Sequence, residues 1–321
     1  MANASHTRGV VTASLAPLAT IALLLPAAGC ADDPQAPPAD APTHDLVFEG
    51  ALEGRPELLR LDAATGAIER VLPPGTLAQD PSPSPDGLLV AFVVADYDSS
   101  TGDIFVCDRD GSNLRQLTTD PELDDQPAWS PDGTRIAFRS FRTQREGDIW
   151  IMDADGGNQR NLTPDPLPGV TDERTPCWSP DGARLAYISN AGGNRDLWTM
   201  AADGSDPRRL VITEGLEAEP AWSPDGAVIA CRYSSPADGS RIRLVPATGG
   251  EPVTLASAGE RRMPAWSPDG TRLVFVGQAT TADRPDLWQM RADGSGEQLL
   301  VGIEVPGGCL NPAFLRRVGA R

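Results

Sequence analysis

The sequence predicts an all-β protein, a six-bladed β-propeller whose blades are four-stranded antiparallel sheets. Three observations lead to this fold: a five-fold repeat of Ser-Pro-Asp-Gly, a second repeated segment that ends in a tight turn, and chain ends that each carry part of one further unit. The Ser-Pro-Asp-Gly copies begin at Ser84, Ser130, Ser179, Ser223 and Ser267. Repeats of about 40–50 residues are typical of propeller blades.

Each Ser-Pro-Asp-Gly is expected to form a turn between the first and second strands of a blade. Proline fixes φ at the second turn position, aspartate favours the third and glycine accepts the fourth. Pro-Ala-Trp or Pro-Cys-Trp precedes four of the copies, and β-prone runs such as Arg-Ile-Ala-Phe at residues 135–138 follow. We therefore interpret the motif as a hairpin turn with no chemical role.

A second repeated segment predicts the third and fourth strands of each blade. Its copies begin with an aspartate before two apolar residues, as in Asp-Ile-Trp, at Asp103, Asp148, Asp196 and Asp286. An Asp-Gly pair follows each copy, and Asp-Gly between alternating segments is a strong hairpin signal. Each unit thus contains four strands joined by two tight turns, as a propeller blade does.

The two ends of the repeat region complete each other. Residues 45–72 hold three candidate strands without a leading Pro-Ala-Trp segment, whereas residues 311–315 are such a leading strand with nothing after it. Joining them into one blade closes the ring and removes exposed sheet edges. Five full units and this composite unit give six blades, so we assign the propeller to residues 45–315.

Tryptophan recurs at one position of the repeat, at Trp129, Trp178, Trp222 and Trp266, with Phe314 in the equivalent place. These rings could form a stacking platform for a ligand. The structural interpretation is favoured, because a large aromatic residue at the same point of every blade fills the wedge between neighbouring sheets.

The first 29 residues are typical of an export signal. A largely apolar run reaches Ala28, and Ala27-Ala28-Gly29-Cys30 resembles the lipobox of bacterial lipoproteins, in which the cysteine is lipidated and becomes the mature N-terminus. An uncleaved transmembrane anchor is the alternative, and Pro17 and Pro26 disfavour it. We therefore expect a lipoprotein of the cell envelope, attached through Cys30 to the membrane and facing the periplasm, at the outer membrane.

Two short segments flank the propeller. Residues 30–44 are rich in proline, alanine and aspartate, which predicts a semi-extended tether, and residues 316–321 form a C-terminal tail. Four cysteines remain after Cys30 is assigned: Cys107, Cys177, Cys231 and Cys309. Buried free thiols are the default expectation for them, although an exported compartment also permits disulfides.

Composition narrows the classes of function. The formal net charge is −18, and every one of the 27 basic residues is arginine, so nucleic acid and anionic lipid headgroups are disfavoured as partners. The predicted mature chain has one histidine, His44, and it has no Gly-x-Ser-x-Gly motif. No Cys/His zinc spacing is present either. We expect no cofactor, no metal site and no enzyme activity.

The repeats resemble those of the TolB-type β-propeller family. The resemblance rests on Pro-Ala-Trp-Ser-Pro-Asp-Gly, on the Ile-Ala-Phe strand and on Asp-Ile-Trp-x-Met-x-Ala-Asp-Gly, and it covers residues 45–315. It implies a periplasmic protein-binding scaffold, here without the α/β domain that precedes the propeller in TolB. Similar WD40-like repeats occur in prolyl oligopeptidase-like peptidases and oligogalacturonate lyases, which need catalytic domains or histidine-rich metal sites that this sequence lacks.

Charged residues cluster just before each leading strand, where the loops that enter the blades are expected to surround one mouth of the central channel. Four successive units carry acids there and one carries a basic pair. The candidate partner-binding rim consists of Asp80, Asp124, Asp125, Asp172, Glu173, Glu217, Glu219, Arg261 and Arg262. Loops that vary on a constant scaffold are typical recognition sites, whereas a solvated charged edge is the alternative interpretation.

The sequence therefore predicts a monomeric, lipid-anchored, non-catalytic envelope propeller that binds a protein partner. The acidic rim would face a cationic surface, with a divalent cation as a further candidate. Neutralising the rim acids should then slow association and leave the fold intact. A glycan-binding or carboxylate-dependent glycan-processing protein is the alternative, because such chemistry needs only two acids about 5–10 Å apart.

Overall fold

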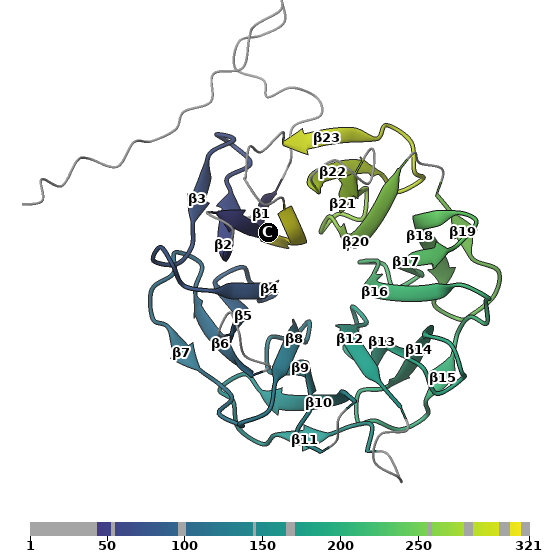
Figure 1. The fold of residues 1–321 in the computed structure, drawn as a ribbon, viewed down its shortest axis with the longest axis horizontal. Coiled ribbons are helices and arrows are strands. Elements are labelled where there is room, and N and C mark those ends of the chain that lie inside the picture. Colours follow the sequence, from purple (N-terminus) through teal and green to yellow (C-terminus); the bar gives the residue numbers. More distant parts are fainter. Residues whose placement is uncertain are drawn as a thin grey trace, which may run out of the picture. The chain divides into compact units, whose positions relative to one another are not determined.

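The computed structural model describes residues 44–52, 55–95, 101–143, 146–164, 171–255, 259–278, 285–301 and 309–315. These residues form six four-stranded antiparallel sheets arranged as a ring (Figure 1). The predicted six-bladed propeller is therefore confirmed. The predicted export signal, Cys30, all of the tether except His44, and the tail at residues 316–321 lie outside the described residues.

The first three blades are numbered from the composite one. Blade 1 consists of β24 (Cys309–Leu315), β1 (Asp45–Leu52), β2 (Arg55–Leu61) and β3 (Ile68–Arg70). Blade 2 consists of β4 (Ala78–Pro83), β5 (Leu89–Ala95), β6 (Gly102–Asp108) and β7 (Arg115–Gln116). Blade 3 consists of β8 (Asp124–Trp129), β9 (Arg135–Ser140), β10 (Asp148–Asp153) and β11 (Arg160–Asn161).

The remaining blades repeat this order. Blade 4 consists of β12 (Glu173–Trp178), β13 (Arg184–Ser189), β14 (Asp196–Ala201) and β15 (Arg208–Arg209). Blade 5 consists of β16 (Leu216–Trp222), β17 (Val228–Ser235), β18 (Gly239–Pro246) and β19 (Val253–Thr254). Blade 6 consists of β20 (Glu260–Trp266), β21 (Arg272–Gln278), β22 (Asp286–Arg291) and β23 (Gln298–Val301).

Blade 1 joins the two ends of the propeller. Its innermost strand, β24, pairs antiparallel with β1, and Leu46 lies opposite Phe314. Because the last strand of the chain completes the first sheet, the ring has no open seam on its inner side. The predicted composite blade is confirmed.

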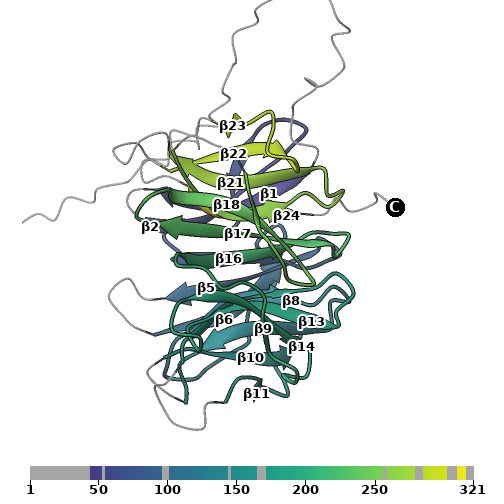
Figure 2. The same ribbon diagram turned by 90° about the vertical axis from the view of Figure 1, so that its right-hand side faces the viewer.

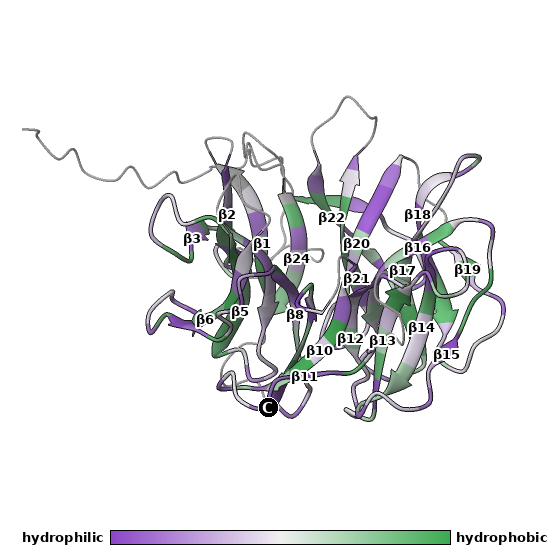
Figure 3. Ribbon diagram, turned by 60° about the horizontal axis from the view of Figure 1, so that its bottom comes forward, coloured by the Kyte–Doolittle hydropathy of each residue, from purple (hydrophilic) through white to green (hydrophobic). Residues whose placement is uncertain are grey.

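The hydrophobic core lies between blades. Trp129 of blade 3 belongs to a cluster with Ile104 and Val106 of blade 2 and with Phe138 of its own sheet. Trp178 occupies the same position between blades 3 and 4. Both rings are less than one tenth exposed, and each ring of this size buries on the order of 150–250 Å². The wedge-filling interpretation of the aromatic repeat is confirmed. Hydropathy follows the same pattern, with apolar residues on middle strands such as β14 (Figure 3).

The Ser-Pro-Asp-Gly segments are hairpin turns, as predicted. In each copy the serine hydroxyl donates to the aspartate carboxylate at 2.5–2.6 Å. In the second copy the Arg135 amide donates back to Ser130 Oγ at 2.9 Å. The closing glycine has positive φ, for example +70° at Gly133. These turns define one end of the ring, which we call the turn face.

The opposite end, which we call the rim face, carries the beginnings of β4, β8, β12, β16, β20 and β24. The second strand of each blade ends there and the third begins there, so the strands of one blade run side by side between the two faces (Figure 2). Within the described residues, no helix is long and apolar enough to cross a membrane.

Candidate functional site: the channel ring

The innermost strand of every blade contains a β-bulge at an x-Pro dipeptide. In blade 2 the pairing of β4 with β5 shifts between Gln79 and Ser82, so Asp80 and Pro81 stand outside the ladder. The same shift occurs in the other five blades. Proline suits this position because it has no N–H to pair. The residues before proline form a ring, which we call the channel ring: Asp80, Gln126, Thr175, Glu219, Met263 and Asn311.

All six members of the channel ring have left-handed backbone, with φ between +48° and +56°. Asparagine and aspartate tolerate this conformation, whereas a β-branched residue such as Thr175 does not adopt it readily. Backbone strain of this kind costs about 1–3 kcal/mol per residue. The repeat therefore places a left-handed residue at the same position of all six innermost strands.

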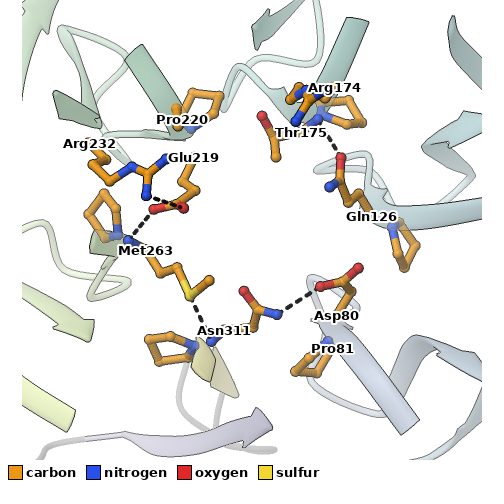
Figure 4. A pocket seen from close by; sticks show the side chains of 15 residues that line it. Asp80, Pro81, Gln126, Arg174, Thr175, Glu219, Pro220, Arg232, Met263 and Asn311 are labelled. Carbon is orange, nitrogen blue, oxygen red and sulfur yellow. Dashed lines mark hydrogen bonds and ion pairs between the residues drawn. The ribbon is translucent and has the colours of Figure 1, made fainter. Parts of the chain in front are cut away.

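Side chains of the ring bind the amide groups that the bulges release. The Thr175 amide donates to Gln126 Oε1 at 2.7 Å, and the Met263 amide donates to Glu219 Oε2 at 2.6 Å. The Asn311 amide contacts Met263 Sδ at 3.3 Å. In each pair the acceptor belongs to one blade and the donor to the next. A side chain with an acceptor atom at this position thus ties neighbouring blades together (Figure 4).

Asn311 completes the ring at the composite blade. Its Nδ2 donates to Asp80 Oδ1 at 2.7 Å and to Glu49 Oε2 at 3.1 Å. One amide group on the last strand therefore contacts β1 of its own blade and β4 of the next blade.

The channel ring lines a cavity of about 330 Å³. The six ring residues and their six prolines form most of the wall, and Arg174, Ala218 and Arg232 complete it. Every ring side chain is half-buried. This volume is at the small end of the range of ligand pockets, about 300–1,000 Å³.

Electrostatics distinguish Asp80 from the other ring members. Burial, reinforced by the Asp125 and Glu49 carboxylates, raises the pKa of Asp80 to about 7. Burial also raises the pKa of Glu49. The Arg139 guanidinium opposes the shift of Asp80 but forms its hydrogen bonds with Asp125. Asp80 at the channel wall therefore lies near two further carboxyl groups and one cation.

The expectation that the candidate rim residues lie on exposed loops is wrong. Asp172 precedes its strand, and the other eight lie within innermost strands. Six of the nine are buried: Asp124, Asp125, Asp172, Glu173, Glu217 and Arg261. Each innermost strand begins before Pro-Ala-Trp. Strand pairing continues on both sides of the bulge, so the charged residues ahead of the motif belong to the strand, which the repeat pattern does not reveal.

Most buried rim residues have a partner of opposite charge. Arg139 binds Asp125 with two hydrogen bonds, at 2.9 and 2.7 Å, and Arg142 binds Asp124. Such forked contacts satisfy both partners. Asp125 is 8% exposed and Asp124 is fully buried, so neither carboxylate presents its charge to solvent.

The other buried members are held by an opposite charge or by a hydroxyl group. Arg174 and Arg195 contact Asp172. Ser189 Oγ donates to Glu173 at 2.7 Å, and Thr213 Oγ1 donates to Glu217 at 2.8 Å. Arg261 donates through Nε to Glu297 at 2.9 Å. These pairs fasten the rim ends of the blades. Asp80, Glu219 and Arg262 are the half-buried members of the predicted set.

Four channel-ring residues escaped the sequence prediction: Gln126, Thr175, Met263 and Asn311. Their signal is positional, because each directly precedes the proline of a leading strand. None of the four side chains is charged, so a search for charged residues passes over them. Among the described residues, no group of three or more His, Cys, Asp or Glu side chains is placed to hold a metal ion.

Solved structures with the same fold include one TolB protein and one putative TolB protein. TolB from Acinetobacter baumannii superposes with a TM-score of 0.73 at 20% identity, over 86% of this chain and 67% of that one. A putative TolB from Agrobacterium tumefaciens gives 0.64 at 23% identity, over 80% of this chain and 88% of that one. An oligogalacturonate lyase in complex with manganese gives 0.55 at 16% identity, over 76% and 73%.

The sequence profile of the TolB beta propeller domain matches residues 44–166 and 90–305, and these two matches together extend over most of the propeller. The chain belongs to the TolB beta propeller domain family.

Proposed function

We propose that this propeller is a non-catalytic binding module of the bacterial cell envelope, exported and anchored through a lipid on Cys30. The observation that carries the binding role is the contrast between the two faces of the ring. The turn face repeats one turn five times, whereas the rim face surrounds a channel whose lining differs in every blade. Variation on a constant scaffold is typical of recognition surfaces.

A protein partner fits this face because family membership points to an interaction scaffold. The partner would contact the mouth of the channel, around half-buried Glu219 and Arg262 and exposed Glu122 and Ile212. The overall charge of −18 favours a cationic partner surface.

The buried rim carboxylates argue against the glycan-processing alternative. Asp124 and Asp125 are held by arginines, and Glu173 accepts a hydrogen bond from Ser189. A carboxylate pair that serves as acid and nucleophile must reach its substrate, and these side chains are less than one tenth exposed.

Site-specific photo-crosslinking in cells would test the binding role. Ile212 is 77% exposed on the rim face and Leu88 is 46% exposed on the turn face, so they form a matched pair of apolar positions for a photoreactive residue. We expect a discrete crosslinked protein from position 212 and none from position 88. Crosslinks from position 88 alone, or from neither position, would contradict the proposal.

The anchor needs a separate measurement. Mass spectrometry of the membrane-extracted protein should find a mature N-terminus at acylated Cys30. The Cys30→Ala variant should then leave the membrane fraction. A different mature N-terminus would remove the lipid anchor from the proposal without affecting the rim face.

A further inference from the structure

The charged groups that line the cavity are unevenly distributed. Blade 2 contributes Asp80, whereas Glu49, Asp125 and Arg139 do not line the cavity and act on Asp80 through their charges. Blades 4 and 5 contribute Arg174 and Arg232, which line the cavity beside Glu219. Because blades 2 and 5 stand opposite each other in a ring of six, Asp80 lies across the opening from Glu219 and Arg232, and Arg232 is directed at Glu219 (Figure 4).

The two arginines are incompletely satisfied. Arg232 approaches Glu219 no closer than 3.7 Å, and Arg174 contacts Asp172. The Nε atoms of Arg174 and Arg232 are buried and have no hydrogen-bond partner among the described residues. The terminal nitrogens of these side chains would therefore make the contact with a ligand. A guanidinium group presents its donors in a fork that matches a carboxylate. This half of the wall is therefore suited to an incoming carboxylate.

The opposite half lacks a positive charge. No arginine of the described residues forms an ion pair with Asp80, because Arg139 is bound to Asp125. Burial is the main cause of the raised pKa of Asp80, and the Asp125 and Glu49 carboxylates add to it. An ammonium group beside Asp80 would supply the missing charge and lower that pKa.

We propose that the channel binds a small zwitterion, with its ammonium group at Asp80 and its carboxylate at Arg232 and Arg174. The cavity of about 330 Å³ has room for a free amino acid or a short peptide. The six prolines supply apolar walls between the charged groups. This proposal does not require the proposed partner, although Glu219 at the channel mouth also lines the cavity.

Calorimetric titration of the mature protein with three related probes tests the proposal. The probes are alanyl-alanine, its N-acetylated form, which lacks the ammonium group, and its C-terminal amide, which lacks the carboxylate. We expect alanyl-alanine to bind at least about tenfold more tightly than either blocked form. Equal binding of all three forms, or binding of none, would overturn the proposal.

Single substitutions assign each end of the ligand. Asp80→Asn keeps an acceptor for the Asn311 amide group, and it should abolish the preference for a free ammonium group while the preference for the carboxylate persists. Arg232→Gln should abolish the preference for a free carboxylate while the preference for the ammonium group persists. Glu251→Gln and Arg55→Gln remove exposed charges from the outside of the propeller and serve as controls that should bind normally.

Thermal melting of each variant shows whether it folds. A folded Asp80→Asn variant that still discriminates against the acetylated probe would overturn the assignment. Proton release gives a second readout, because an ammonium group that lowers the pKa of Asp80 expels a proton near neutral pH. The binding enthalpy of the wild type should then depend on the ionisation enthalpy of the buffer, and that of Asp80→Asn should not.

Discussion

Asn311 donates its side-chain amide to the Asp80 carboxylate at 2.7 Å, although 231 residues separate them in the sequence. Asn311 lies on the strand that completes blade 1, and Asp80 lies on the first strand of blade 2. The same amide group also binds Glu49 on β1. Closure of the propeller therefore includes a polar contact inside the channel in addition to the pairing of β24 with β1.

Loss of the Asn311 side chain should destabilise the ring. Asn311→Gly removes the contacts with Asp80 and Glu49. Because glycine adopts the left-handed backbone without strain, a loss of stability in this variant is due to the missing side chain. We expect about 1–3 kcal/mol less free energy of unfolding, since two half-buried or buried carboxyl groups lose a donor. Chemical denaturation measures this change.

Asn113→Gly is the matched control. Asn113 is also left-handed, with φ of +54°, but it lies in an exposed turn and binds only Asp108. Its replacement should change the free energy of unfolding by less than about 0.5 kcal/mol. Equal losses in the two variants would show that Asn311 has no special role in closure.

The pH dependence of stability should report on Asp80. The pKa of Asp80 is raised to about 7 in the folded protein, so the folded state holds this proton more tightly than the unfolded chain does. The stabilisation from the protonated form is therefore lost as pH rises from the ordinary aspartate pKa through about 7.

Asp80→Asn removes this dependence. Urea unfolding of the variant and of the wild type would be compared at pH about 5.5 and at pH about 8. The difference between their free energies of unfolding should shift in favour of the variant at the higher pH. An identical difference between variant and wild type at both pH values would contradict the raised pKa.

Each serine of the repeated turn should contribute to stability through its aspartate. Ser130→Ala removes the 2.6 Å bond to Asp132 and the contact with the Arg135 amide. We expect a loss of about 1 kcal/mol in the free energy of unfolding.

The same variant should change a titration. Hydrogen bonds from Ser130 and Thr134 lower the pKa of Asp132 to about 2. Carboxyl NMR should show this pKa rising in Ser130→Ala. A pKa of Asp132 that stays unchanged would contradict the assigned hydrogen bond.

Neutralising the rim acids should damage the fold, contrary to the expectation from sequence. Asp125→Asn leaves Arg139 buried without its counter-charge, which costs about 3–5 kcal/mol. A melting curve of Asp125→Asn measures the loss, and exposed Glu122→Gln is the control that should melt like the wild type. A normal melting temperature for Asp125→Asn would contradict the structural role of this pair.

The fold was predictable because its determinants are local and repeated. Turn chemistry at Ser-Pro-Asp-Gly and aromatic residues such as Trp129 define the strands and their packing without knowledge of long-range contacts. The composite blade followed from the two incomplete ends alone, at Asp45 and Leu315.

The site was less predictable because it depends on a backbone irregularity. The bulge turns the side chain before each proline into the channel, and the residue two positions earlier is buried inside the blade. Asp124 and Glu173 therefore resemble surface acids in sequence although both are buried. The side chains of Thr175 and Met263 do not indicate a role in the channel by their chemistry. Only their position before the proline of a leading strand indicates it.

Hydrogen exchange with a bound partner tests the central claim of a rim-face binding site most directly. The partner would be the purified protein identified by crosslinking at Ile212. We predict slower exchange in peptides that cover residues 120–126, 171–175 and 212–219 on the rim face. Peptides that cover the turns at residues 84–89 and 130–135 should exchange as in the free protein. Protection confined to those turns would contradict the account.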